Sequence, residues 1–283
     1  MLFISIKSRM EKLSNLIHRI LIKHIDPLTK SPELILLGYC SNETASEHLS
    51  RYLLASKFAH GLVLDVASGT CYGSSILKRT DDVKMVVGID IDMDVLNYGR
   101  IVYDAECVCA DATRLPFRKH AFDSVVSLET LEHIRDPKLF LDNVKDSLKK
   151  GGKLILSTPN KMCTSPFLPK PLNPYHVNEF YLGPLLNFIR LHGFNIDQIY
   201  GGRTVKRLEL LRRILGSLLK FFLSKVSLKP YLLDDLYTQF ITRLIRSERK
   251  HLIDPDPNII VHEEVKNRSN IVLYQYFLIC AHL

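Results

Sequence analysis

The chain lacks several patterns that would assign it to a class at once. Its six cysteines form no CxxC pair and have no zinc-ligand spacing, which predicts reduced thiols in a cytoplasmic protein. No apolar run reaches the ~18 residues that a membrane-spanning helix needs. The apolar start at 1–7 is shorter than a signal-peptide core, and no internal repeat or low-complexity tract is present. These absences leave a globular protein as the expectation.

Positive charge is in excess, but it is unevenly placed. The formal net charge is +8 and the pI is about 9.1, yet residues 61–160 hold slightly more acids than bases. The excess therefore lies in the flanks, which argues against a nucleic-acid groove through the core and favours basic peripheral surfaces. The 283 residues are 46% hydrophobic, enough for one large domain with insertions or for two small ones.

From position 61 onward, apolar runs of strand length alternate with helical patterns. We expect strands over 62–66, 83–91, 106–110, 122–128, 153–157, 194–200 and 271–281, and helices over 47–58, 94–100, 137–149 and 177–192. Gly151-Gly152 and Gly193 are predicted to end the last two helices, and the proline-rich 161–176 to form a loop. Repeated units of this length predict a parallel sheet with helices on both faces.

The two flanks have a different pattern. Residues 1–25 are typical of a basic amphipathic helix, which either docks on its own domain or lies on a membrane surface. In 203–250 an apolar helical stripe is opposed by a basic face. Either the helix packs on the domain with its basic face in water, or its basic residues also contact anionic lipid headgroups. We therefore expect a helical extension at 1–46, a core at 47–202, a helical lid at 203–257 and a returning strand at 258–283.

Three acids follow successive predicted strands: Asp65, Asp90 and Asp111. In a doubly wound sheet the carboxyl ends of the strands line the ligand crevice. A carboxylate at Asp90 can accept two hydrogen bonds from a ribose diol, and Asp111 can accept one from an adenine amino group. The small-residue turn at 67–73 lets backbone N–H groups approach a ligand closely. Any one of these acids could instead be a cap or turn residue, but three together favour a nucleotide site.

The same stretches resemble the class I S-adenosylmethionine-dependent methyltransferases, in particular the group with the quinone-precursor methyltransferases and many enzymes of cell-surface glycan synthesis. The resemblance covers about 47–202 and the final strand, through Arg51–Ala55, Val63–Thr70, Val87–Asp90, Ala110–Ala112, Ser127–Ile134, Gly151–Asn160 and Asn173–Phe180. One departure lies in the first loop. The family's usual acid-x-Gly-x-Gly-x-Gly is here occupied by Ala67, Gly69 and Cys71.

The resemblance implies an α/β, doubly wound, Rossmann-like sheet of seven mostly parallel strands with an antiparallel last strand. It implies that Asp65 and the loop of Ser68 and Gly69 hold the methionine end of S-adenosylmethionine, and that Arg51 and Tyr52 close over its carboxylate. Asp90 would bind the ribose, and Leu128 would lie beside the sulfonium. The residues implied to contact the adenine are Ile91, Asp111 and Ala112.

The implied reaction is methyl transfer, to oxygen of a small, glycan or lipid-linked acceptor. A hydroxyl acceptor needs a base, and the candidates are His133 and His176, unless the first holds its loop and the second caps the next helix. Glu129 and Glu132 can orient the substrate; no ligand spacing forces a metal site, and none is expected. Two other functions stay open: an NAD-dependent oxidoreductase, although G-x-G-x-x-G is missing, and a non-catalytic binding module with a degraded cofactor loop.

Overall fold

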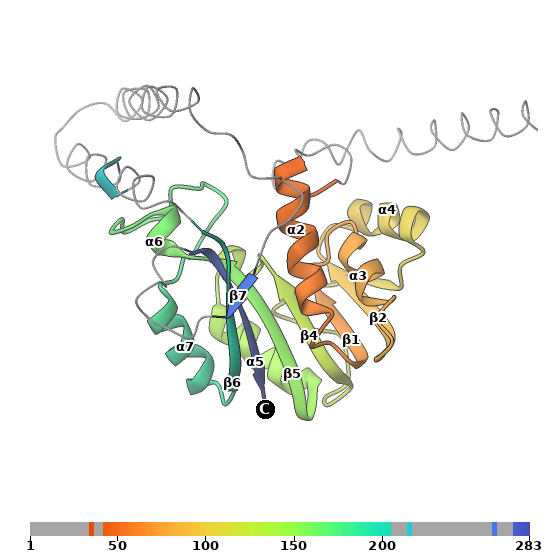
Figure 1. The fold of residues 1–283 in the computed structure, drawn as a ribbon. Coiled ribbons are helices and arrows are strands. Elements are labelled where there is room, and N and C mark those ends of the chain that lie inside the picture. The colour runs from red at the N-terminus through yellow and green to blue at the C-terminus, as the bar shows by residue number, and fades with distance from the viewer. Residues whose placement is uncertain (1–33, 37–41, 205–213, 217–261, 265–273) are drawn as a thin grey trace, which may run out of the picture.

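A computed structural model describes residues 34–36, 42–204, 214–216, 262–264 and 274–283 as an α/β architecture (Figure 1). Its helices are α2 (Asn42–Ala55), α3 (Tyr72–Leu77), α4 (Met93–Tyr103), the 3-10 turn η1 (Leu131–His133), α5 (Pro137–Ser147), α6 (Lys161–Thr164) and α7 (Leu182–Leu191). Its strands are β1 (Gly61–Val66), β2 (Val83–Asp90), β3 (Cys107–Cys109), β4 (Phe122–Leu128), β5 (Leu148–Pro159), β6 (Asn195–Thr204), β7 (His262–Glu264) and β8 (Tyr274–His282). Over this part of the chain, no helix has the length and apolarity needed to cross a membrane.

The strands form one sheet in the order β3-β2-β1-β4-β5-β8-β6-β7. Strands β1 to β5 pair in parallel, whereas β8 runs antiparallel to both β5 and β6. The predicted fold class is therefore confirmed, and the structure adds a short edge strand, β7, to the seven that were expected. Strand order reverses between β1 and β4. In an open α/β sheet the ligand crevice lies at this point, outside the carboxyl ends of the strands.

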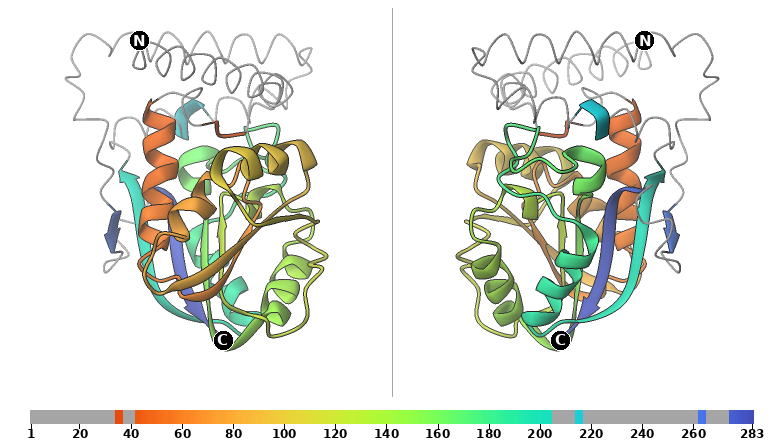
Figure 2. Two further views of the ribbon diagram at one scale, coloured as in Figure 1. Left: turned by 90° about the vertical axis from the view of Figure 1, so that its right-hand side faces the viewer. Right: turned by 90° about the vertical axis from the view of Figure 1, so that its left-hand side faces the viewer.

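Helices cover both faces of the sheet, and α2 and α5 lie on opposite sides of it (Figure 2). Successive residues of β1 point to opposite faces: Leu64 joins the core cluster that contains α5 and α7, while Val63 joins the cluster that contains α2 and α3. Both residues are fully buried. Because the strands are buried on both faces, they occur in the sequence as nearly continuous apolar runs.

The predicted end of α5 is wrong. The helix ends at Ser147, and Gly151-Gly152 lie inside β5, where the pairing with β4 is irregular between Phe122 and Ser124. Gly151 adopts a positive φ of 75°, which an L-residue avoids. The two glycines therefore shape the start of a strand rather than the end of a helix.

The predicted start of α7 is also wrong, because the helix begins only at Leu182. Before it, the backbone N–H groups of Val177 and Asn178 donate to the carbonyl of Glu132, 2.8 and 2.9 Å away. These bonds tie the segment to the turn η1 and remove it from the helix. The helix does end where Gly193 predicted, with a φ of 92° at that glycine.

Several predictions concern residues outside the described part of the chain. These are the amphipathic helix over 1–25 and nearly all of the basic block over 203–250. The four-part division of the chain therefore stays a prediction.

Gly73 allows the close packing of α3 on α2. A Cβ atom at this buried position would lie 2.0 Å from Cζ of the Tyr52 ring. We expect Gly73→Ala to lower the free energy of unfolding by about 1–3 kcal/mol, because the ring is held by its hydroxyl and cannot move aside freely. Urea unfolding followed by circular dichroism measures this change.

The matched control is Gly183→Ala in α7, where a new Cβ meets nothing within 4 Å. We expect this variant to be as stable as the wild type or slightly more stable, because alanine favours a helix. Equal stabilities for the two variants would contradict the packing described for Gly73.

Candidate active site

The loop after β1 is bound directly to the end of β2. The N–H of Gly69 donates to Oδ2 of Asp90 at 2.9 Å, and the N–H of Asp92 donates to Oδ1 at 3.0 Å. Burial raises the pKa of the Asp90 carboxyl, while these backbone hydrogen bonds act in the opposite direction. A carboxylate has about four acceptor positions, so an Asp90 held in this way can still accept from a diol.

The loop itself has a left-handed backbone at three alternate residues. Ala67, Gly69 and Cys71 have φ angles of 57°, 54° and 61°, at the three positions where the resemblance expects glycine. The side chain of Cys71 is fully buried, with Sγ 3.4 Å from the Ser68 hydroxyl. Cys71 therefore packs beneath the loop and does not crowd the crevice. The Ser68 hydroxyl also faces inward and donates to the carbonyl of Ile89, leaving backbone groups to face a ligand.

Asp65 is fully buried in β1. Its carboxylate accepts hydrogen bonds from the Ser74 hydroxyl at 2.6 Å and from the Tyr52 hydroxyl at 3.2 Å. Burial raises the pKa of this carboxyl to about 7, although both hydrogen bonds lower it. Tyr52 thus donates a hydrogen bond to Asp65. Near neutral pH both the neutral and the charged form of this carboxyl are populated.

Arg51, one residue before Tyr52 on α2, is buried beside the crevice. Its Nη2 lies 3.4 Å from a carboxylate oxygen of Glu129, and its guanidinium carbon lies 3.8 Å from the ring centre of Tyr276. Burial lowers the pKa of Arg51, but the charges of Glu129 and Tyr276 outweigh it and raise the pKa overall. Nε and Nη1 have no hydrogen-bond partner among the described residues. These two donors can therefore receive an anionic group of a ligand.

The residues assigned to the adenine and the sulfonium line the same edge of the sheet. Ile91 follows β2 and is 74% exposed, and Leu128 ends β4 with 9% exposed. Asp111 and Ala112 follow β3. One oxygen of Asp111 accepts from both the backbone N–H and the hydroxyl of Thr113, each at 2.7 Å, and these bonds lower the pKa of Asp111. An ionised, hydrogen-bonded Asp111 can still accept from an amino group.

The two candidate bases lie together although the sequence separates them widely. His133 ends η1 and His176 lies in the loop before α7, with their ring centres 5.1 Å apart. His133 holds its loop as one alternative expected, since Nδ1 lies 3.0 Å from the carbonyl of Tyr175. The predicted cap by His176 is wrong. The helix starts later, and Nδ1 of His176 binds the Glu179 carboxylate at 2.9 Å.

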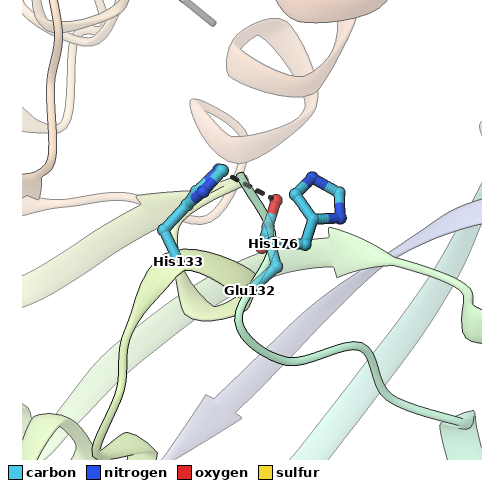
Figure 3. Close-up of side chains that lie close together, drawn as sticks. All are labelled: Glu132, His133 and His176. Carbon is cyan, nitrogen blue, oxygen red and sulfur yellow. Dashed lines mark ion pairs between the residues drawn. The ribbon is translucent and has the colours of Figure 1, made fainter. Parts of the chain in front are cut away.

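Glu132 completes this group of side chains (Figure 3). It is 1% exposed, and its Oε2 accepts from the Thr158 hydroxyl at 2.9 Å. Burial and the charge of Glu129 raise the pKa of Glu132 well above its usual value. One ligand atom from each of Glu132, His133 and His176 lies within 4.8 Å of the others.

Several residues of the site were not found from the sequence. Ser74 contacts Asp65, and Tyr276 contacts Arg51. Glu179 orients His176. Tyr276 lies on the last strand, far along the chain from α2, so no local pattern could connect it with Arg51. Glu179 lies within Asn173–Phe180, one of the stretches that resemble the methyltransferases. Nothing in the spacing of that stretch predicted its hydrogen bond with His176.

Part of the chain matches a known protein family. A family described as a methyltransferase domain matches residues 64–156. A probable S-adenosylmethionine-dependent methyltransferase of Mycolicibacterium smegmatis is 29% identical over 52% of this chain and 57% of its own length. Phosphoethanolamine N-methyltransferase 1 of Triticum aestivum is 28% identical over 74% of this chain and 43% of its own length. The chain thus spans about half the length of these curated relatives.

A solved structure shares the fold. The crystal structure of an S-adenosylmethionine-dependent methyltransferase from Archaeoglobus fulgidus matches with a TM-score of 0.52 and 17% identity, over 86% of this chain and 95% of that one. This likeness concerns the fold, whereas the matched domain and the named relatives concern the sequence. Residues 64–156 thus match a methyltransferase domain, and the chain resembles S-adenosylmethionine-dependent methyltransferases in sequence and in fold.

Proposed function

We propose that this chain transfers a methyl group from S-adenosylmethionine to an oxygen atom of a small, glycan-derived or lipid-linked acceptor. The observation that carries the proposal is the Asp90 carboxylate, fixed by the N–H groups of Gly69 and Asp92 at the end of β2. Such a carboxylate suits the two hydroxyls of a ribose. The buried donors of Arg51 support the same ligand, because they suit the carboxylate of its methionine part.

The proposal assigns a role to each candidate site residue. S-adenosylmethionine supplies an activated methyl group, and the protein aligns the acceptor and excludes water. Asp65, positioned by Tyr52, pairs with the amino group of the methionine part, and Leu128 packs beside the sulfonium. Residues Ile91, Asp111 and Ala112 contact the adenine. His133 or His176 accepts the proton of a hydroxyl acceptor.

The acceptor atom separates this proposal from a neighbouring one. The wheat relative is named for methylation of the nitrogen of phosphoethanolamine. An acceptor panel of hydroxyl compounds and of amines, assayed with labelled S-adenosylmethionine, distinguishes the two. Methylation of amines alone would overturn the assignment to oxygen.

The cofactor assignment predicts the effect of Asp90→Ala. We expect the dissociation constant for S-adenosylmethionine to rise about 30-fold, since the loss of charge-assisted hydrogen bonds costs about 2 kcal/mol. Calorimetric titration measures it, with NAD as the competing ligand. Asp81 is an exposed acid just before β2, so Asp81→Ala is the matched control and should bind as the wild type does. An unchanged constant for a folded Asp90→Ala, or tight binding of NAD, would reject the assignment.

Asp65 predicts that cofactor binding releases protons. Its pKa of about 7 in the free protein means that the carboxyl is mostly neutral at pH 6, whereas an ammonium partner favours the ionised form. We therefore expect affinity to increase from pH 6 to pH 7.5, with proton release greatest at pH 6 and falling toward pH 8. Calorimetry in buffers of different ionisation enthalpy measures the protons released.

Asp65→Asn is the control for this linkage, since the amide keeps the size of the side chain but does not titrate. Its affinity should be weaker and should not increase over the same pH range. An equal proton release by the variant and the wild type would show that another group titrates on binding.

Contact with the cytoplasmic face of a membrane is a further part of the proposal, and it rests on sequence alone. The basic, apolar-striped block over 203–250 lies almost wholly outside the described residues. We expect the chain to sediment with anionic liposomes at low salt, to do so less at moderate salt, and not to sediment with neutral liposomes. The absence of sedimentation with anionic liposomes at low salt would reject this part.

A further inference from the structure

We propose that Glu132, His133 and His176 bind a divalent metal cation beside the crevice, with zinc as the best fit. The site needs only the side chains of this chain, so the binding of a cation does not depend on the proposed methyl transfer. The role given to the cation at the end of this subsection does rest on that function.

The hydrogen bonds at Nδ1 of the two histidines set the same tautomer in both rings. A carbonyl oxygen cannot donate, so the Nδ1 of His133, 3.0 Å from the carbonyl of Tyr175, must carry the proton. Nδ1 of His176 donates in the same way to the Glu179 carboxylate at 2.9 Å. In a neutral imidazole this leaves Nε2 as the lone-pair nitrogen. Metal-binding histidines commonly donate their other N–H to a carbonyl or carboxylate, which fixes the ring and raises its basicity.

Glu132 supplies the negative charge. Its side chain is buried, and a buried carboxylate is costly unless it is paired or coordinates a metal. Oε2 is held by the Thr158 hydroxyl at 2.9 Å, and Oε1 lies 4.0 Å from Nε2 of His133. The nearby cation Arg51 is engaged by Glu129. Two imidazoles and one carboxylate on one side of a cation form a set typical of transition metals.

The backbone holds these ligands close before any metal binds. The carbonyl of Glu132 accepts the N–H groups of Val177 and Asn178, and the Asn178 side chain donates to the carbonyl of Ile134 at 2.6 Å. These bonds clamp the loop of His176 to the turn of His133. Metal bonds near 2.1 Å require ligand atoms about 3–3.5 Å apart, so these atoms, which lie within 4.8 Å of one another, need only a small further approach.

The choice of metal follows from the ligands. Imidazole nitrogen suits zinc and other late first-row ions, whereas magnesium prefers oxygen ligands and dehydrates reluctantly. Three protein ligands also leave coordination positions open for water or substrate.

The cation would change the role of the histidines. A nitrogen bound to a metal cannot accept a proton, so neither histidine is then the base. An acceptor hydroxyl bound at an open position becomes more acidic and can lose its proton to water. Glu132 lies four residues after Leu128, the residue assigned to the sulfonium, so a cation here favours acceptors with an oxygen that can bind a metal.

The test is calorimetric titration of the full chain with Zn²⁺, Mn²⁺ and Mg²⁺ after removal of bound ions with a chelator. We expect one ion per cluster, with Mg²⁺ the weakest. Glu132→Gln and the more exposed His133→Ala should each weaken binding about tenfold or more. His192→Ala is the matched control, since its Nδ1 makes the same kind of bond to a backbone carbonyl, at 2.8 Å, and it lies outside the ligand group.

A spectrum identifies the ligands independently of affinity. Co²⁺ bound by nitrogen and oxygen ligands gives visible absorption that should change in His133→Ala and stay the same in His192→Ala. Dissociation constants above ~1 mM for all ions, or equal affinities in wild type, Glu132→Gln and His133→Ala, would overturn the inference. S-adenosylmethionine is titrated into the same samples. Cation binding without cofactor binding rejects only the proposed function, and the reverse result rejects only the metal site.

Discussion

The close approach of the loop after β1 to strand β2 is the constraint on which the crevice depends. The N–H groups of Ser68 and Gly69 donate to Ile89 and Asp90, so two successive loop amides are held by the end of one strand. This approach is possible because Gly88 has no side chain, since a Cβ there would lie 2.7 Å from the Ser68 hydroxyl. The parallel register pairs Asp65 with Gly88. Asp65 and Asp90 therefore lie at the same edge of the sheet.

Ionisable side chains in strained or costly environments gather at this edge. Asp65 and Glu132 are buried with raised pKa values, and Arg51 is buried with donors that no described residue satisfies. Left-handed backbone at Cys71 and Glu129 adds strain in the loop after β1 and directly after β4. Structural ion pairs can also shift pKa values, but these groups all lie where the fold places a ligand. The free-energy cost of these buried ionisable groups and of the strained backbone is therefore concentrated where ligand binding can offset it.

The side of the crevice that holds His133 and His176 is built differently, because these residues lie on connecting segments between strands and not at strand ends. Its geometry depends on the carbonyl of Glu132, which accepts two N–H groups from a segment more than forty residues later. A side chain on η1 and another on the loop before α7 are thereby brought together, and Glu179 and Tyr175 orient their rings. This part of the site can vary in chemistry while the cofactor half stays the same, which is typical of loops on a rigid scaffold.

The sequence by itself determined the fold class and the positions of three candidate site acids relative to the strands. Strand β4 has the predicted limits, and Asp65, Asp90 and Asp111 lie at or just after the ends of β1 to β3, because alternating elements and turns are local features of the chain. Only the tertiary structure decided which distant side chains meet: Arg51 with Tyr276, His133 with His176, and Asp65 with Ser74. It also decided that the helix before Gly193 begins at Leu182. Long-range contacts and hydrogen bonds from Val177 and Asn178 set these features, and no periodicity within the sequence encodes such pairs.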